Sequence, residues 1–224
     1  MKPSMKKIFW VFISLVFISP WFLILVGNSR LTFPFQERLV SIQNDIFLDK
    51  VNNLRGETIS AGLGLSGKLL VNKYFYFGKE VINRYLESYD PHFLFFSGEA
   101  NLSKSTLTTG PLYLTFLPLI VYAIFKIATN IKRKETKLLL FWLLVSAIPA
   151  AFVYAHYETI ARIPFFLVLT FITAYGLVKL FSSKKALAIL LTIFIIFETL
   201  RFYHDFKVHY PRRLGENLYS IPKK

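Results

Sequence analysis

The chain has no cysteine among its 224 residues, so disulfide bonds and thiolate chemistry are excluded. Common metal and nucleotide motifs are also missing. There is no H-E-x-x-H, no D-x-D or Asp-Asp pair, no P-loop and no nucleophile elbow. We therefore expect no metal site built from protein side chains alone. Acidic residues are scarce as well, with 13 Asp and Glu against 27 Lys and Arg.

Apolar residues, in contrast, make up 54% of the chain, and the mean hydropathy is +0.46. A soluble domain of this length could not bury so much apolar surface, which predicts a membrane protein. The net charge of +14 would suggest nucleic-acid binding in a soluble protein. Here the basic residues lie in short clusters between apolar runs, where they set orientation and meet anionic lipid head groups. We expect membrane lipid as a partner and no nucleic acid.

Five apolar runs are about as long as a spanning helix requires. They cover residues 8–27, 112–129, 138–155, 163–181 and 186–202. The first lacks the short apolar core and the small-x-small site of a cleaved signal peptide, which favours an uncleaved anchor kinked at Pro20.

The positive-inside rule places the N-terminus and the Lys-rich separators 130–137 and 182–185 in the cytoplasm. The fold class predicted is an all-α integral protein of the cell inner or plasma membrane with about five transmembrane helices. One long loop, containing an amphipathic interfacial helix, and the C-terminus lie outside. The expected division is an anchor (residues 1–27), an external loop (28–109), a four-span bundle (110–203) and an external tail (204–224).

The long loop contains its own helical patterns. Residues 72–89 place aromatic and apolar side chains at three- and four-residue steps, which predicts an amphipathic helix at the membrane surface. That stripe is Tyr74, Phe77, Val81, Tyr85 and Tyr89. Residues 37–53 favour a second helix. The glycines within residues 56–67 do not form a dinucleotide-binding turn, and we interpret that stretch as a flexible loop.

Residues 91–118 lead from the polar region back into apolar sequence, and three external segments would meet beside them. The polar candidates for a site are Glu99, Asn101, Lys104, His156, Glu158, Arg162, His204 and His209. Arg162 lies at the outer edge of a predicted span, where a charge requires a partner or a water-filled cavity. Its guanidinium suits a phosphate. Alternatively, it snorkels to water or pairs with Glu158, and the sequence leaves these readings open.

Glu198 and Arg201 lie three residues apart near the end of the last predicted span. That spacing puts them on one helix face, which favours a structural ion pair over a proton relay.

Four segments in this order resemble the bacterial protein O-mannosyltransferase-like glycosyltransferases of the polytopic GT-C class. They are NLRG at residues 53–56, the stretch 72–102 with its DPHFLFFSGEANL end, GPLYLTFLP at 110–118, and FYHDFKVHYP at 202–211. The match covers nearly the whole chain but only the C-terminal half of such an enzyme. The resemblance therefore implies either a split subunit, whose partner is a separate N-terminal half carrying the family's acidic external loop, or a truncated descendant of such an enzyme.

The resemblance implies sugar transfer, with inversion, from a polyprenyl-phosphate sugar to an acceptor at the outer membrane face. It implies that Arg162 and Lys104 bind the lipid phosphate and compensate the charge of the leaving group. Ser103-Lys104 stands where the family has Arg-His, and Glu99 stands where the family has Asp. The catalytic residue stays unassigned, with Glu99 as the candidate base. No cofactor is identified. The alternative is a non-enzymatic membrane protein that binds lipid or a partner protein through its external loop.

Overall fold

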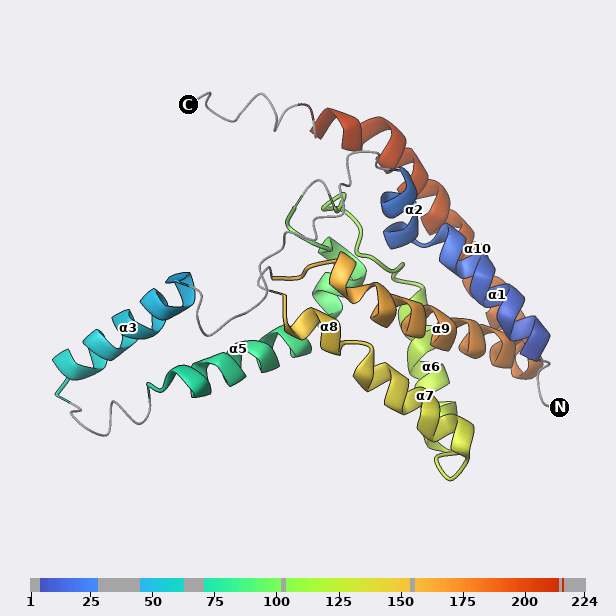
Figure 1. The fold of residues 1–224 in the computed structure, drawn as a ribbon. Coiled ribbons are helices and arrows are strands. Elements are labelled where there is room, and N and C mark those ends of the chain that lie inside the picture. The colour runs from blue at the N-terminus through green and yellow to red at the C-terminus, as the bar shows by residue number, and fades with distance from the viewer. Residues whose placement is uncertain are drawn as a thin grey trace.

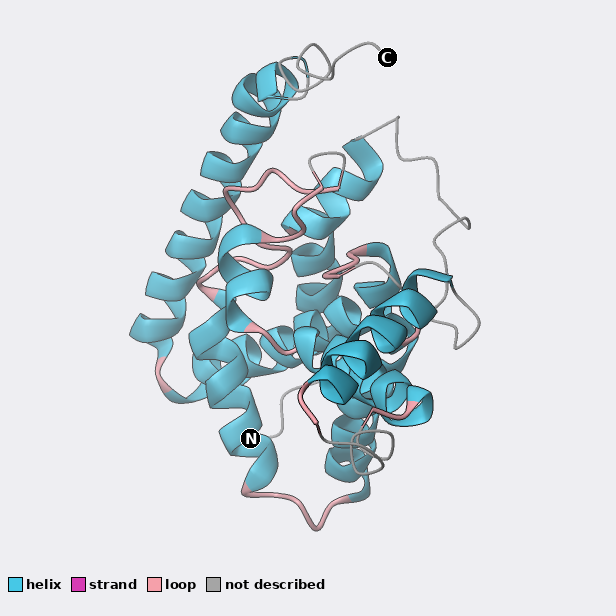
Figure 2. Ribbon diagram, turned by 90° about the vertical axis from the view of Figure 1, so that its left-hand side faces the viewer, coloured by secondary structure: helices cyan, strands magenta, loops and turns pink. Residues whose placement is uncertain are grey.

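The computed structural model describes residues 5–27, 45–62, 71–101, 104–153, 156–213 and 215. Within these ranges the chain is all-α and forms no strand, which confirms the all-α part of the predicted fold class (Figure 2). The α-helices are α1 (Met5–Ile18), α2 (Pro20–Gly27), α3 (Asp45–Ser60), α5 (Lys73–Glu87), α6 (Phe116–Ala128), α7 (Lys134–Val145), α8 (Ile148–Ala151), α9 (Ile163–Ser183) and α10 (Lys185–His204). Three short segments complete them: the π-helices η1 (Phe93–Ser97) and η3 (Asp205–His209), and the 3₁₀-helix η2 (Ile160–Arg162).

Helix α9 is the centre of the bundle, and α1, α6 and α10 pack on it (Figure 1). Eleven of its 21 residues are buried. At Gly176 a Cβ atom would lie 2.5 Å from the carbonyl oxygen of Leu119 on α6. The close approach of α6 and α9 therefore requires glycine at this position, in the way that small residues permit tight packing of membrane helices.

Two helical stretches, Ile160–Ser183 and Lys185–Arg213, are long and apolar enough to cross a membrane. The pair Met5–Ile18 and Pro20–Gly27 meets the same test as one span bent by 55°. The bend lies at Ser19 and Pro20, as predicted from Pro20. The backbone there is satisfied by the loop that precedes α6, because Tyr113 donates to the Ile18 oxygen at 2.6 Å and Pro111 accepts from the Trp21 N–H at 3.2 Å.

The other two predicted spans form shorter helices. α6 has 13 residues and α7 has 12. At ~1.5 Å per residue each is roughly 20 Å long, against a hydrocarbon core of about 30 Å. The helix expected from residue 112 begins only at Phe116, and the one expected to reach residue 155 ends at Val145 before Pro149, which lacks a backbone N–H. Two or three helices of spanning length are thus present among the described residues, and the count of five stays a prediction.

The amphipathic helix predicted for residues 72–89 is α5, capped by Asn72, whose side chain accepts from the Tyr74 N–H at 2.9 Å. Its aromatic stripe differs from the expectation. Tyr85 and Tyr89 pack against the bundle, and their hydroxyls donate to the oxygens of Leu144 and Leu143 at 3.1 Å. Those carbonyls belong to the last turn of α7, where no intrahelical donor is available.

Residues 37–53 were expected to be helical, and the described part of that segment begins α3, which lies apart from the bundle (Figure 1). The expectation of a loop from residue 56 is wrong for residues 56–60, because α3 continues through them to Ser60. Gly56 has nothing within 4 Å of its Cβ position, so its presence costs the helix only about 1 kcal/mol. Residues 63–67 of the predicted loop lie outside the described residues.

Candidate functional site

One end of the bundle gathers most of the irregular backbone in the described chain. We call it the loop end and define it as residues 88–101, 104–113, 156–162 and 205–213. It contains η1, η2 and η3, and both non-glycine residues with positive φ among those described, Leu107 (φ 62°) and Tyr157 (φ 54°). π-helical turns and left-handed non-glycine residues are unfavourable by themselves and cluster at functional sites. The loop end is therefore the candidate functional site.

Two glycines close the loop on itself. Gly98 has φ 65°, and a Cβ there would lie 2.6 Å from the Ser105 hydroxyl. At Gly110 a Cβ would collide with the carbonyl of Leu94, which accepts from the N–H of Leu112 at 2.9 Å. Both positions exclude a side chain, so residues 93–98 and 104–112 are held side by side.

Arg162 is fully buried, with 0% of its side chain exposed, and it stands at the centre of this end. Its guanidinium lies 5.2 Å from the centroid of the Phe93 ring. It donates to four acceptors: Ser88 Oγ at 3.1 Å, Glu158 O at 2.9 Å, Arg84 O at 3.2 Å and Glu87 Oε2 at 3.2 Å. The snorkelling interpretation is therefore wrong, because the charge does not reach solvent. The contact with Glu158 is real but uses its main-chain oxygen, and the carboxylate partner is Glu87.

Lys104 forms the second buried pair of the site. Its Nζ lies 2.7 and 2.8 Å from the two carboxylate oxygens of Glu158 and 3.8 Å from Glu99 Oε1. All three side chains are at most 7% exposed. The other oxygen of Glu99 accepts from the N–H of Thr159 at 3.0 Å. The structure thus brings together four predicted candidates, Glu99, Lys104, Glu158 and Arg162, from segments about 60 residues apart.

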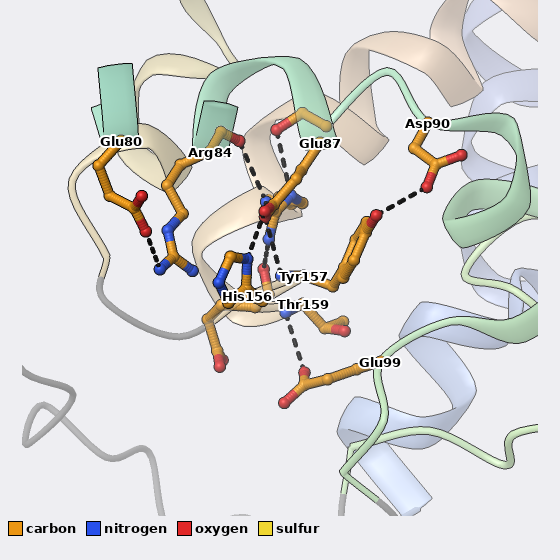
Figure 3. A network of polar contacts seen from close by, with 11 residues as sticks. Glu80, Arg84, Glu87, Asp90, Glu99, His156, Tyr157 and Thr159 are labelled. Atoms are coloured by element: carbon orange, nitrogen blue, oxygen red, sulfur yellow. Dashed lines mark hydrogen bonds and ion pairs between the residues drawn. The ribbon is translucent and has the colours of Figure 1, made fainter. Parts of the chain in front are cut away.

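Glu87 connects these pairs to solvent (Figure 3). Its Oε2 accepts from Arg162 and from the N–H of Tyr157, each at 3.2 Å, and its Oε1 lies 2.5 Å from His156 Nδ1. The His156 side chain is 62% exposed, so it forms the outer boundary of the cluster. The Tyr157 hydroxyl donates to Asp90 Oδ2 at 2.9 Å. Burial and then this hydrogen bond raise the pKa of Tyr157.

We name the set Glu87, Glu99, Lys104, His156, Glu158 and Arg162 the Arg162 cluster. Glu87 was not among the candidates selected from the sequence, because it lies outside the aromatic and apolar stripe predicted for residues 72–89. In the structure Arg84 is 2% exposed and pairs with Glu80 at 2.7 Å. The signal that was available is the spacing of Arg84, Glu87 and Ser88, which puts three polar side chains on one face of the last turns of α5.

Of the remaining candidates, Asn101 borders the cluster and the two histidines lie on α10 and η3. Asn101 is exposed, and its carbonyl accepts from the Lys104 N–H at 3.0 Å. His204 and His209 are exposed on α10 and η3, with ring centroids 5.3 Å apart. Within the described ranges no three His, Asp or Glu side chains are grouped so that they could hold a metal ion.

The segment after α10 is fastened to the loop end by a separate ion pair. Arg213 Nη2 lies 2.6 and 2.7 Å from the Asp205 carboxylate, and Arg213 Nη1 donates to the Thr106 oxygen at 2.8 Å. Thr108 donates to the same carboxylate at 2.7 Å. These contacts place residues 205–213 against residues 106–108.

The predicted pair of Glu198 and Arg201 is wrong. Glu198 Oε2 accepts from the N–H of Thr115 at 3.0 Å and from its hydroxyl at 2.5 Å, while Arg201 is exposed. The physical reason is that Thr115 is the N-cap of α6, where free N–H groups and the helix dipole attract a carboxylate.

No family model, no curated protein and no solved structure matches this chain. The resemblance drawn from the sequence segments therefore stays a prediction.

Proposed function

We propose that this chain is an integral membrane protein whose loop end binds the phosphate of a polyprenyl-phosphate sugar and contributes that site to a GT-C-like sugar transfer. The proposal includes the predicted topology in the inner or plasma membrane, with the N-terminus cytoplasmic and the loop end outside. The two long apolar helices and the bent pair α1–α2 support membrane insertion. So do the many large apolar side chains exposed on α7 and α10.

The observation that carries the proposal is the convergence of three of the four segments on which the resemblance rests. The N–H of Leu112 donates to the Leu94 oxygen, which joins residues 110–118 to residues 90–101. Thr108, just before residues 110–118, contacts Asp205 in residues 202–211. Segments about 100 residues apart are thus held together at the loop end, where Lys104 and Arg162 also lie. Residues 53–56, in contrast, lie on α3, away from this end.

The two cations have different roles in the proposal. Lys104 has a compact ammonium with three donors and lies against the carboxylates of Glu158 and Glu99, so a phosphate can replace Glu158 there. Arg162 is held by four acceptors and fixes the Glu158 main chain through Nη1. We therefore assign phosphate binding to Lys104 and positioning to Arg162. Glu99, the candidate base, is 6% exposed and would have to leave the Thr159 N–H to reach an acceptor.

The test is stabilisation of the purified full chain by lipid. Undecaprenyl-phosphate mannose should raise the unfolding midpoint, and undecaprenol, which lacks the phosphate, should not. A ligand present at a hundred times its Kd adds about 2.7 kcal/mol to stability. Lys104→Met should abolish the phosphate-dependent part, and Lys79→Met, which removes an exposed lysine of α5, should leave it intact. Equal stabilisation by the phosphate-free lipid would refute the proposal.

A non-enzymatic role is the second candidate, and one observation favours it. Arg162 and Lys104 already have carboxylate partners within the chain, so the cluster is complete without a ligand. In that case the loop end is a rigid platform for a partner protein. The same lipid titration separates the candidates. A wild-type chain that the phosphate does not stabilise, yet that co-purifies with another membrane protein, would establish the second.

A further inference from the structure

The two ends of the bundle differ in whether their basic side chains are paired with carboxylates. At the loop end and in the adjoining turns of α5, the buried cations Arg84, Lys104 and Arg162 each have a carboxylate within 3.2 Å. The opposite end, where α6 and α9 finish and α1, α7 and α10 begin, carries ten basic side chains. We call it the basic end; its members are Lys6, Lys7, Lys126, Lys132, Arg133, Lys134, Lys137, Lys179, Lys184 and Lys185.

These ten cations have almost no internal compensation. Glu135 is the single acidic residue in the described helices and turns of this end. Among the residues that the structure describes, every ion pair within 4 Å lies elsewhere, and none includes a member of the basic end or Glu135. Uncompensated like charges repel one another and favour anions from outside the chain.

The tertiary structure, rather than the sequence, draws these cations together. α6 and α9 run in the same direction and touch at Leu119, Ala123 and Gly176. The Tyr122 hydroxyl, near the middle of α6, lies 3.0 Å from Oγ of Ser183, the last residue of α9. The basic turn that follows α9 is therefore fixed against the helix that leads into the other basic turn.

Two of the lysines rest on aromatic rings. Lys126 Nζ lies 5.6 Å from the centroid of the Tyr122 ring, and Lys179 Nζ lies 5.8 Å from that of Tyr175. An ammonium that lies on the face of an aromatic ring still has N–H donors that point away from the ring. Both ammoniums are thus held in place with hydrogen-bonding capacity left for an anion.

The neighbouring surface indicates which anion binds. Large apolar side chains are exposed immediately next to the basic turns: Phe125 on α6, Leu138 and Phe141 on α7, and Leu187 and Leu190 on α10. A phosphate next to a wide apolar surface is the chemistry of a lipid rather than of a free anion. We propose that the basic end binds the headgroups of anionic phospholipids, with the acyl chains lying along these apolar faces.

The proposal is independent of sugar transfer and has its own test. The full chain in zwitterionic micelles is titrated with dioleoylphosphatidylglycerol, with dioleoylphosphatidylcholine, or with inorganic phosphate. Bound lipid is counted by native mass spectrometry and the unfolding midpoint is followed. Phosphatidylglycerol should bind and stabilise at low salt, and the effect should weaken as salt is added.

Each Lys or Arg near an anionic surface contributes roughly fivefold in affinity, so removing three should weaken binding on the order of a hundredfold. The variant is Lys132→Gln/Arg133→Gln/Lys134→Gln, and all three side chains are exposed. Lys184→Gln/Lys185→Gln, from the other turn, should weaken binding by about 25-fold. The matched control is Lys79→Gln/Lys207→Gln/Arg212→Gln, which removes three exposed charges outside the basic end and should have no effect.

Three results would overturn the proposal: equal stabilisation by phosphatidylcholine, an equal loss in the matched control, or full stabilisation by inorganic phosphate alone. Lys104→Met should retain the phosphatidylglycerol effect, so failure at the loop end and failure at the basic end are distinguishable.

Discussion

Replacing Lys104 by methionine removes one charge from a pair that is buried on both sides. Lys104 is 7% exposed and Glu158 is 3% exposed, and two short contacts of 2.7 and 2.8 Å join them. The N–H of Ile160, 3.4 Å from Glu158 Oε1, is a poor substitute for the lost ammonium. Breaking one side of a buried ion pair costs about 3–5 kcal/mol, and we expect Lys104→Met to fall in this range.

A double-mutant cycle with Glu158→Gln isolates the pair itself. Hydrogen bonds to charged groups are worth about 1.5–3 kcal/mol, and contacting residues couple by similar amounts. The double variant should therefore cost less than the sum of the two single variants by about 2 kcal/mol. The measurement is equilibrium unfolding in mixed micelles of increasing SDS fraction, followed by circular dichroism.

The control is Lys79→Met, since Lys79 is exposed and surface substitutions usually change stability by less than about 0.5 kcal/mol. A coupling energy below about 0.5 kcal/mol would mean that Lys104 and Glu158 act independently. The Arg162 cluster would then not be assembled as described.

Three further predictions concern packing, capping and pH. Gly176→Ala should destabilise the protein by about 1–3 kcal/mol, because the new Cβ would collide with the Leu119 carbonyl. Gly56→Ala should stabilise it by about 0.5–1 kcal/mol, because the new Cβ contacts nothing and alanine favours the helix. Thermal unfolding of both variants separates the steric from the entropic effect. Glu198→Ala should lower the stability by about 1 kcal/mol, because the N-terminus of α6 loses its carboxylate acceptor. Arg201→Ala should leave the stability nearly unchanged in the same assay. Equal losses in the two variants would instead indicate an ion pair between Glu198 and Arg201. Because the pKa of Tyr157 is raised in the folded state from an ordinary value of 10.0, its contribution is present below about pH 10 and is lost as pH rises further. Stability should therefore fall above about pH 10 less steeply in Tyr157→Phe than in wild type, and identical slopes would contradict the raised pKa.

The helices were predictable wherever composition and period left a single solution. Residues 163–181 and 186–202 are apolar and bounded by charge, and they became α9 and α10. Residues 72–89 have a clear helical period and became α5. Helix ends were less predictable. α6 begins only at Phe116, after residues 93–98 and 104–112 are held side by side, and that pairing depends on contacts between residues distant in the chain. α7 ends at Val145, ahead of Pro149.

The site illustrates the same division. Arg162, Lys104, Glu158 and Glu99 could be selected from the sequence because charges beside apolar runs require partners. Glu87 could not, because a glutamate on an amphipathic helix is normally solvated, and only the docking of α5 turned it inward.

The amino-acid sequence by itself determined the helical class, the apolar segments and the surplus of positive charge, since these follow from composition and from periods of a few residues. Tertiary structure decided which charges were neutralised. It buried Arg162 and Lys104 among carboxylates about 55 to 75 residues away in the chain, and it left the cations of the basic end without any. Pairing is a property of distance in space, and the sequence records only distance along the chain.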